Sequence, residues 1–365
     1  MNIRPQKILF VVLLLLLSAG LVCLFSSCHQ EGIFIKKDIF QKQLLWLGVG
    51  LCAMVLAARS DYKKLRLFAW PLYGVVLATL GFVLVAGRII MGAQRWISLG
   101  EFSFQPSELG KFVLILLLAQ YFSQKNITDV RFSARPLSFV GGLLWPLGIM
   151  MIPAGLVLLQ PDLGTAVVYI FLFLSVAFMA GVPLRYLLGL VFFGLSCFPI
   201  FWHFLKDYQK SRLLVFLNPN SDPLGAGYTV IQSQIAIGSG RWFGRGWMAG
   251  TQSQLNFLAE RHTDFIFSVW GEEWGFLGSI VLLFLYGVLI VSILRIADRA
   301  QDAYGKLLCV GFAALIFFHV LVNIAMNIGM CPVVGLPLPF VSYGGSSLLI
   351  NLLGVGIVLS VARQR

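Results

Sequence analysis

The chain has 365 residues, of which 59% are hydrophobic and only 12% are charged, and its mean hydropathy is +0.88. Soluble domains carry about twice that share of charged residues, so the composition excludes a soluble globular protein and indicates a polytopic membrane protein. The net charge of +12 does not indicate nucleic-acid binding, because the basic residues lie in short segments between apolar runs, where they set membrane topology.

Apolar runs long enough to cross a bilayer, about 20 residues each, occur ten times along the chain. They lie at 8–27, 41–58, 67–87, 107–123, 138–159, 163–182, 186–205, 264–294, 307–330 and 342–362. The first run is longer than the core of a signal peptide and shows no small-residue cleavage site, so we keep it as a span. We therefore predict an all-α polytopic membrane protein of about ten transmembrane helices, residues 1–365 forming a single integral-membrane domain.

Lysine and arginine are distributed unevenly between the two sides of this topology. With the N-terminus in the cytoplasm, more than half of the 27 Lys and Arg residues fall on the cytoplasmic side, with few acids. The positive-inside rule then places both chain termini in the cytoplasm. It places outside one long loop, about 206–263, between spans seven and eight, and two shorter segments at 88–106 and 331–341. The long loop mixes charged and apolar residues, which suggests amphipathic pieces at the membrane interface.

The six cysteines show no metal-ligand spacing. Most lie within apolar runs, where a cysteine behaves as a small buried residue. Cys28 and Cys331 would lie near the outer face, so a disulfide between these two is the alternative to two free thiols.

The main functional signal lies where the long outer loop enters span eight. There five polar residues directly precede an apolar run, namely Glu260, Arg261, His262, Thr263 and Asp264. Charge at a membrane edge is costly and is a functional hypothesis by default. Asp264 is interpreted either as a helix cap or, as its neighbours favour, as a general base facing the small residues of span eight. Glu272 and Glu273 lie deeper on different faces, and one of them is expected in a structural ion pair.

Two further segments start helices at the outer face. Glu108 and Lys111 are three residues apart and share a helix face. They form either a self-neutralising pair or, with Arg95, a site for an anionic headgroup. Asp162, after Gln160 and Pro161, is interpreted mainly as a helix cap.

Polar residues also recur in the last two spans. His319, Asn323 and Asn327 are spaced four apart and predict a stripe that hydrogen-bonds to neighbouring helices. The segment 337–347, rich in hydroxyl groups and glycine, would line a cavity as it turns into the last span.

From the residues alone, three classes of function stay open. A transporter should carry charges deep in several spans, whereas nearly all charge here lies at the outer ends. An enzyme acting on a lipid-linked substrate fits better, since basic groups for a phosphate and a carboxylate lie at the bilayer edge. A scaffold that holds a partner protein is the third alternative.

Six stretches carry a family resemblance: RWISLG…FQPSELGK, QPDLGTA, RLLVFLNPNSDPLGAGY, QSQIAIGSG, GTQSQLNFLAERHTDFIFSVWGEEWGFLG and PLPFVSYGGSS. They span most of the chain and resemble the signatures of the SEDS family, the bacterial RodA, FtsW and SpoVE proteins. The stretch that contains Asp264 is more similar to the elongation (RodA) branch than to the division (FtsW) branch. The connection at 330–332 is shorter than in the family, so a role for 331–341 transfers least.

The resemblance implies a peptidoglycan glycosyltransferase that polymerises lipid II at the outer face of the bacterial cytoplasmic (inner) membrane. It implies Asp264 as the catalytic carboxylate, a class B penicillin-binding protein as transpeptidase partner, other elongation-machinery proteins and no nucleic acid. A divalent cation such as Mg²⁺ would help the pyrophosphate leave. A lipid II flippase and a non-catalytic scaffold are the alternatives. The expected substrate-binding residues are Arg95, Glu108, Lys111, Asp162, Arg212, His262 and Ser342.

Overall fold

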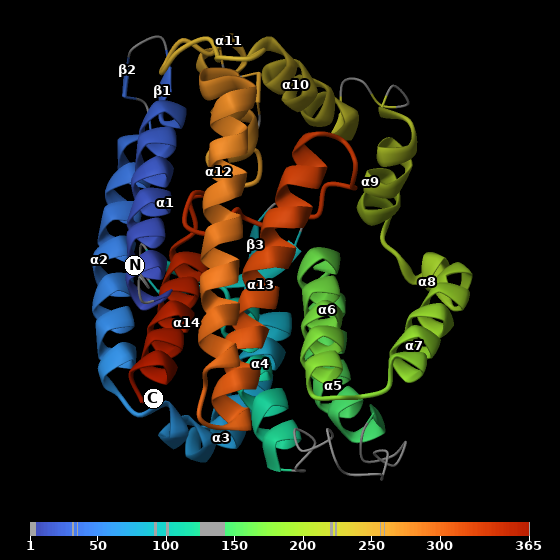
Figure 1. Cartoon of the computed structure of the whole chain (residues 1–365). Helices are drawn as coiled ribbons and strands as arrows, with labels where there is room; N and C mark the ends of the chain where they lie inside the picture. Colours follow the sequence, from blue (N-terminus) through green and yellow to red (C-terminus); the bar gives the residue numbers. More distant parts are fainter. Residues whose placement is uncertain are drawn as a thin grey trace. The chain divides into compact units, whose positions relative to one another are not determined.

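The computed structural model describes residues 5–30, 33–34, 36–90, 93–99, 102–124, 143–219, 222, 225–255, 257–258 and 260–364. Helices dominate these residues (Figure 1). Six helices are long and apolar enough to cross a membrane: α1 (Pro5–Ser27), α2 (Lys37–Arg59), α3 (Leu65–Ala86), α12 (Ile266–Asp298), α13 (Ala303–Asn327) and α14 (Gly345–Arg363). Shorter apolar helices are α5 (Trp145–Leu159), α6 (Leu163–Met179) and α7 (Leu184–Ser196). Helix α4 (Pro106–Gln124) has 19 residues, with Glu108 and Lys111 in its first two turns. The chain is therefore an all-helical membrane protein.

Each of the ten predicted spans coincides with helical structure, but the seventh is not one helix. Helix α7 ends at Ser196, and α8 (Phe198–Phe204) begins after Cys197. Pro199 lies in the first turn of α8, where its missing N–H leaves no bond unmade. The same proline could not continue the hydrogen-bond ladder of α7, so the apolar run divides. The first residues of the fifth predicted span, 138–142, lie outside the described residues.

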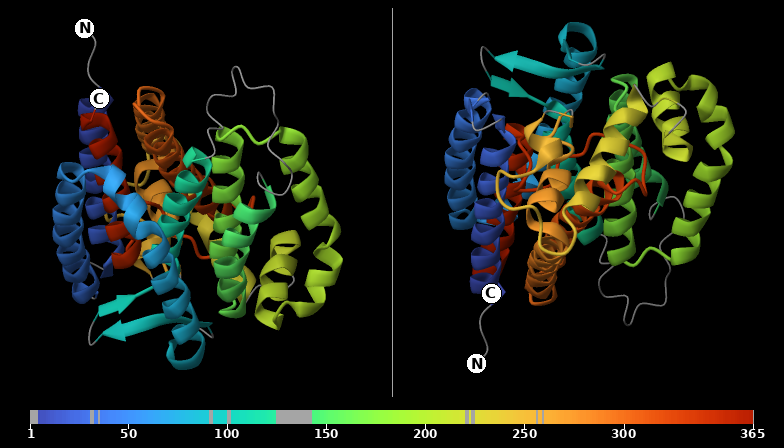
Figure 2. Two further views of the ribbon diagram at one scale, coloured as in Figure 1. Left: turned by 90° about the horizontal axis from the view of Figure 1, so that it is seen from below. Right: turned by 90° about the horizontal axis from the view of Figure 1, so that it is seen from above.

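Two small antiparallel sheets occur where only loops were predicted. Strands β3 (Arg88–Ile90), β4 (Ala93–Leu99) and β5 (Phe102–Phe104) form a three-stranded sheet, in which Ile97 pairs with Phe104 (Figure 2). Strands β1 (His29–Gln30) and β2 (Ile33–Phe34) form a two-stranded sheet. The β-branched and aromatic residues in both segments favour extended backbone.

The long predicted outer loop is largely helical. It contains α9 (Asp207–Leu217), α10 (Ala226–Ser239) and the single turn α11 (Thr251–Gln254). Helices α10 and α11 lie near the beginning of α12 (Figure 1). The prediction that amphipathic pieces of this loop lie at the membrane interface stays a prediction.

The chain divides into two compact units, with boundaries inside α2, α12, α13 and α14. The first unit comprises residues 1–51, 207–292 and 316–351, and the second comprises 52–206, 293–315 and 352–365. In the second unit, α4 packs against α3, α5 and α6. Residues 112–119 of α4 are buried on every side of the helix, which fits its uniformly apolar sequence. A charged pair on α4 is therefore placed inside protein.

Candidate functional site

The predicted site residues divide between the two units. Asp264, His262, Arg212 and Ser342 belong to the first unit, and Arg95, Glu108, Lys111 and Asp162 belong to the second.

Asp264 lies in the turn that precedes α12, because the helix begins at Ile266 rather than at residue 264 as predicted. Its backbone carbonyl accepts hydrogen bonds from the side-chain amides of Asn323 and Asn327 on α13, each at 3.0 Å. Asn327 also accepts a 2.5 Å bond from the Ser268 hydroxyl. The predicted polar stripe of α13 therefore forms hydrogen bonds, and its main acceptor is the backbone of the candidate base.

The two residues before Asp264 are held in the same way. The carbonyl of His262 accepts from the Tyr343 N–H at 2.8 Å, and the carbonyl of Thr263 accepts from the Ser342 hydroxyl at 2.7 Å. The Ser342 oxygen in turn accepts from the Leu338 N–H at 2.8 Å. Ser342 thus uses its only hydroxyl hydrogen within the protein, and it positions the turn that carries Asp264.

The side chain of Asp264 is half-buried and lies beside Gly335. A Cβ on Gly335 would lie 3.4 Å from the Oδ2 atom of Asp264, and Gly335 has a φ of +74°. This is a backbone conformation that only glycine adopts at little cost. The connection between α13 and α14 therefore approaches the candidate base closely.

His262 is buried in a basic environment. Its Nδ1 lies 3.4 Å from the Lys36 ammonium, and its Nε2 lies 3.8 Å from a Glu260 carboxylate oxygen. Burial, followed by the charges of Lys36 and Arg261, lowers the pKa of His262 to about 4. The imidazole is therefore neutral at neutral pH, so that Nδ1 accepts from Lys36 and Nε2 carries the hydrogen.

Arg261, one of the five polar residues before span eight, is a buried cation that was not among the predicted substrate-binding residues. It is 1% exposed and donates to the His29 carbonyl at 3.3 Å, while its Nε and Nη1 groups have no hydrogen-bond partner in the structure. Burial lowers the pKa of this guanidinium. Such donors in a folded protein call for a water or an anion.

Arg212 on α9 contacts the connection that contains Gly335. Its Nη1 donates to the Val333 carbonyl at 3.2 Å, and its guanidinium lies 5.7 Å from the ring centre of Tyr208. The first unit thus holds Arg212 against the segment that borders Asp264.

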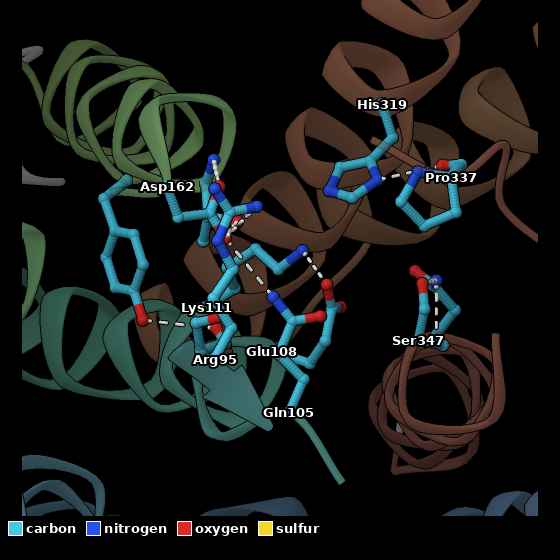
Figure 3. Close-up of polar contacts among 12 residues, drawn as sticks. Arg95, Gln105, Glu108, Lys111, Asp162, His319, Pro337 and Ser347 are labelled. Atoms are coloured by element: carbon cyan, nitrogen blue, oxygen red, sulfur yellow. Dashed lines mark hydrogen bonds and ion pairs between the residues drawn. The ribbon is translucent and has the colours of Figure 1, made fainter. Parts of the chain in front are cut away.

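In the second unit, Asp162 has the capping role that was predicted for it. Its carboxylate accepts from the Thr165 N–H at 3.1 Å at the start of α6 and from the Thr165 hydroxyl at 3.0 Å. Gln105 donates to it at 3.3 Å, and the Arg95 guanidinium lies 3.7 Å away. Arg95 also donates to the carbonyls of residues 160 and 161 (Figure 3), which ties β4 to the start of α6.

Glu108 and Lys111 form the predicted pair on α4. The Lys111 ammonium donates to the Glu108 carboxylate at 2.6 Å (Figure 3). The Lys111 side chain is 1% exposed and the Glu108 side chain is 6% exposed. Two opposite charges at this distance neutralise each other inside the protein. Removing one of them would leave the other as an uncompensated buried charge, which lowers stability.

Among the described residues, neither Glu272 nor Glu273 forms the predicted ion pair with a basic residue. Glu272 instead accepts from the N–H groups of Gln252 and Ser253, at 2.9 and 3.1 Å, at the start of α11. Glu273 accepts from the Met248 N–H at 3.2 Å and from the Ser26 hydroxyl. Both carboxylates fasten the outer loop to α12.

The described residues show neither the alternative disulfide nor a cluster of metal ligands. Cys28 and Cys331 are free thiols. Within the described ranges, no three His, Cys, Asp or Glu side chains gather where a metal ion could bind. The described residues therefore do not form a protein-built cage for Mg²⁺.

The protein is an integral membrane protein, as its long apolar helices show. Its candidate acid–base site is a carboxylate on a turn held by hydrogen bonds, with basic groups in the same unit. The family model described as cell cycle protein, FtsW/RodA/SpoVE, matches residues 6–365. The chain therefore belongs to the FtsW/RodA/SpoVE family.

Individual relatives agree over the whole length. The peptidoglycan glycosyltransferase MrdB of Escherichia coli K12 is 40% identical, with 100% of this chain and 94% of that protein covered. The peptidoglycan glycosyltransferase RodA of Treponema pallidum is 33% identical, with 98% and 97% covered.

Solved structures share the fold. A chain from a peptidoglycan synthase complex, described as coordinating polymerization and crosslinking, is 39% identical with a TM-score of 0.80, and the match covers 98% of this chain and 97% of that one. The rod shape determining protein RodA of Thermus thermophilus is 34% identical with a TM-score of 0.72, covering 98% and 96%.

Proposed function

We propose that this chain polymerises lipid II into glycan strands at the outer face of the bacterial cytoplasmic membrane during cell elongation, with Asp264 as general base. The chain is a peptidoglycan glycosyltransferase, as are its curated full-length relatives MrdB and RodA. The observation that carries the assignment of the base is the geometry of Asp264. Its backbone is fixed by side chains of α13, while its carboxylate is only half-buried.

The reaction joins two sugars in a single displacement. The 4-hydroxyl of one lipid II sugar attacks the anomeric carbon of another, and the bond from that carbon to undecaprenyl pyrophosphate breaks. The hydroxyl proton passes to the Asp264 carboxylate, and the electron pair of the broken bond leaves with the pyrophosphate. An α-linked donor then gives a β-linked product, so the configuration inverts and no covalent sugar–enzyme species forms.

Other carboxylates of the first unit are less suited to this role. Glu272 and Glu273 are 0% and 2% exposed. Backbone N–H groups bind both oxygens of Glu272, and the Met248 N–H and the Ser26 hydroxyl bind one oxygen of Glu273. A base must reach a substrate hydroxyl within hydrogen-bond distance, which favours the half-buried Asp264.

Basic residues of the same unit would stabilise the leaving pyrophosphate. Arg212 on α9 is half-buried and donates to the Val333 carbonyl in the connection that borders Asp264. Arg261 has two buried N–H groups without a partner among the described residues. Donors placed in a low-dielectric site stabilise developing negative charge strongly. We propose Arg212 and Arg261 as phosphate or glycan contacts, and His262 and Ser342 as residues that position the turn.

Arg95, Glu108, Lys111 and Asp162 are proposed to bind substrate in the second unit. Their mutual contacts support a fixed arrangement of charges. An exposed edge of this arrangement is the Arg95 side chain, which is 20% exposed, so Arg95 is the member best placed to meet an anionic group.

We further propose a class B penicillin-binding protein as partner, with both chain termini in the cytoplasm and residues 1–365 acting as one membrane domain. The likeness to a chain of a peptidoglycan synthase complex supports such an assembly. The excess of lysine and arginine on one side of the predicted topology supports the orientation.

A polymerisation assay on the purified full-length chain tests this function. Lipid II is supplied with and without a co-purified class B penicillin-binding protein, and glycan chains are resolved on a gel. We expect glycan strands, and more of them in the complex. Lipid II that crosses vesicle membranes without forming polymer would instead indicate a flippase. A complex that neither polymerises nor transports lipid II would indicate a scaffold.

A further inference from the structure

Helix α12 is broken within its first half, and a loop segment fills the break. Gly275 has a φ of +66° inside the helix. A break of this kind leaves backbone groups without helical partners. Four hydrogen bonds between the loop and the helix provide these partners. The loop N–H groups of Arg245 and Gly246 donate to the helix carbonyls of Glu272 (2.9 Å) and Glu273 (3.1 Å). The helix N–H groups of Phe276 and Leu277 donate to the loop carbonyls of Arg241 (2.8 Å) and Trp242 (3.1 Å).

The loop backbone lies directly against the helix backbone. A Cβ on Gly240 would lie 2.0 Å from the Gly271 carbonyl oxygen, and one on Gly244 would lie 2.0 Å from the Glu273 carbonyl oxygen. Only glycine permits an approach this close. The segment 240–246 is therefore a fixed platform rather than a solvated loop.

Large side chains of this platform remain outside the protein core. Trp242 is 63% exposed and Phe243 is 80% exposed, and both guanidinium-bearing residues, Arg241 and Arg245, are exposed. Trp242 packs edge-on against Phe276, itself 52% exposed on α12, at 5.1 Å between ring centres. Helix α12 has the length and hydropathy of a membrane span, so these exposed aromatic residues lie on or beside a helix that is apolar enough to cross a membrane.

A hollow of about 630 Å³ opens in the platform, lined by residues 239–245 and Ala249. Arg241 and Arg245 both line it. Arg245 donates to the Ser239 carbonyl at 3.4 Å and to the Thr251 hydroxyl at 3.2 Å. Neither arginine forms an ion pair with another described residue. Glu272 on α12 is fully buried, and its carboxylate accepts from the Thr251 hydroxyl at the start of α11.

We propose that this hollow binds the headgroup of an anionic bilayer phospholipid. Arg241 and Arg245 would contact the phosphodiester, and Trp242, Phe243 and Phe276 would contact the upper acyl chains. Two cations without acidic partners complement an anionic headgroup, and tryptophan beside them is typical of the membrane–water interface. A water-soluble phosphate would leave the exposed aromatic residues without a partner. This site goes beyond the proposed glycosyltransferase reaction and does not depend on it.

Fluorescence quenching at Trp242 tests the proposal. The full-length chain is placed in phosphatidylcholine nanodiscs that contain increasing fractions of phosphatidylglycerol brominated on its acyl chains. The signal of a Trp242→Phe variant is subtracted, so that only quenching local to Trp242 remains. We expect brominated phosphatidylglycerol to quench Trp242 at a fraction about tenfold lower than brominated phosphatidylcholine requires.

Three variants define the site. The double variant Arg241→Gln/Arg245→Gln should raise the quenching midpoint about tenfold. Phe243→Ser keeps both charges and should also raise it, because the acyl contact is lost. The control Arg295→Gln/Arg299→Gln removes an exposed pair with the same spacing at the far end of α12 and should leave the midpoint unchanged. Equal quenching by the two lipids, or an unchanged midpoint in either platform variant, would overturn the proposal.

Discussion

Asn327 offers a test of how Asp264 is positioned, because its amide donates to the Asp264 carbonyl and accepts from Ser268. In Asn327→Leu, we expect the polymerisation rate to fall by about 10²-fold with little change in the lipid II concentration needed for half the maximal rate, since a misplaced base slows chemistry more than binding. Asn351→Leu is the matched control, because the Asn351 amide bonds only to Ser347 within α14. Equal losses in both variants would contradict a positioning role.

The buried imidazole of His262 makes stability depend on pH. Its pKa is lowered from 6.5 to about 4 in the folded protein, so the unfolded chain binds more protons between these values. Stability should therefore be complete above about pH 6.5 and fall toward pH 4, by on the order of 3 kcal/mol. In His262→Gln this part of the loss should disappear from the melting temperature measured against pH. An identical pH profile in the variant would contradict the assignment.

The Glu108–Lys111 pair can be tested for stability and activity separately. Lys111→Met leaves a buried carboxylate alone and should lower the free energy of unfolding by about 3–5 kcal/mol. The double variant Glu108→Gln/Lys111→Met should recover much of this loss. If these residues also bind substrate, the folded double variant will still polymerise lipid II poorly. Full activity in that variant would show that the pair is structural only.

At the level of elements, the connection between α13 and α14 depends on one glycine. Gly335 has a φ of +74° and faces the Asp264 carboxylate. Gly335→Ala should lower the free energy of unfolding by about 1–2 kcal/mol and reduce the polymerisation rate. Gly48→Ala is the control, because Gly48 lies within α2 and a Cβ there would meet nothing within 4 Å. Loss of stability in the control alone would contradict this reading of Gly335.

The helices were predictable because each is an apolar run long enough for a bilayer, a local property of the sequence. The division of α7 from α8 needed the Pro199 signal, which the run of apolar residues concealed. The break in α12 at Gly275 could not be read from the sequence, since residues 241–246, distant in the chain, provide the partners of its backbone. The three-stranded sheet was missed because two of its strands, β3 and β5, have only three residues each, too few to show an alternating pattern.

Part of the candidate site was also predictable. The caps and pairs at Asp162 and at Glu108–Lys111 follow from spacing within one helix. The polar stripe of α13 was recognised, but its acceptor, the Asp264 carbonyl, depends on tertiary packing. Arg261 was noticed as part of the charged cluster before span eight, but its burial and its contact with His29 were not predictable, and Lys36 gave no signal, because a cation next to a loop is ordinarily solvated.

The whole molecule belongs to the FtsW/RodA/SpoVE family, and its full-length relatives are named as glycosyltransferases. This agrees with a carboxylate, Asp264, whose backbone is held by hydrogen bonds at the start of a membrane helix. The fold supplies a rigid backbone under Asp264, and the reaction requires a base whose carboxylate meets a sugar hydroxyl. The identity of that base is the central claim.

The most direct measurement compares lipid II polymerisation by the wild-type chain and by Asp264→Asn, each co-purified with a class B penicillin-binding protein. Asparagine keeps the shape of the side chain and the backbone bonds to Asn323 and Asn327, but it cannot accept the proton. With equal amounts of folded complex, we expect glycan strands from the wild type and no detectable product from the variant. Wild-type rates of polymerisation by Asp264→Asn would contradict the assignment of the base.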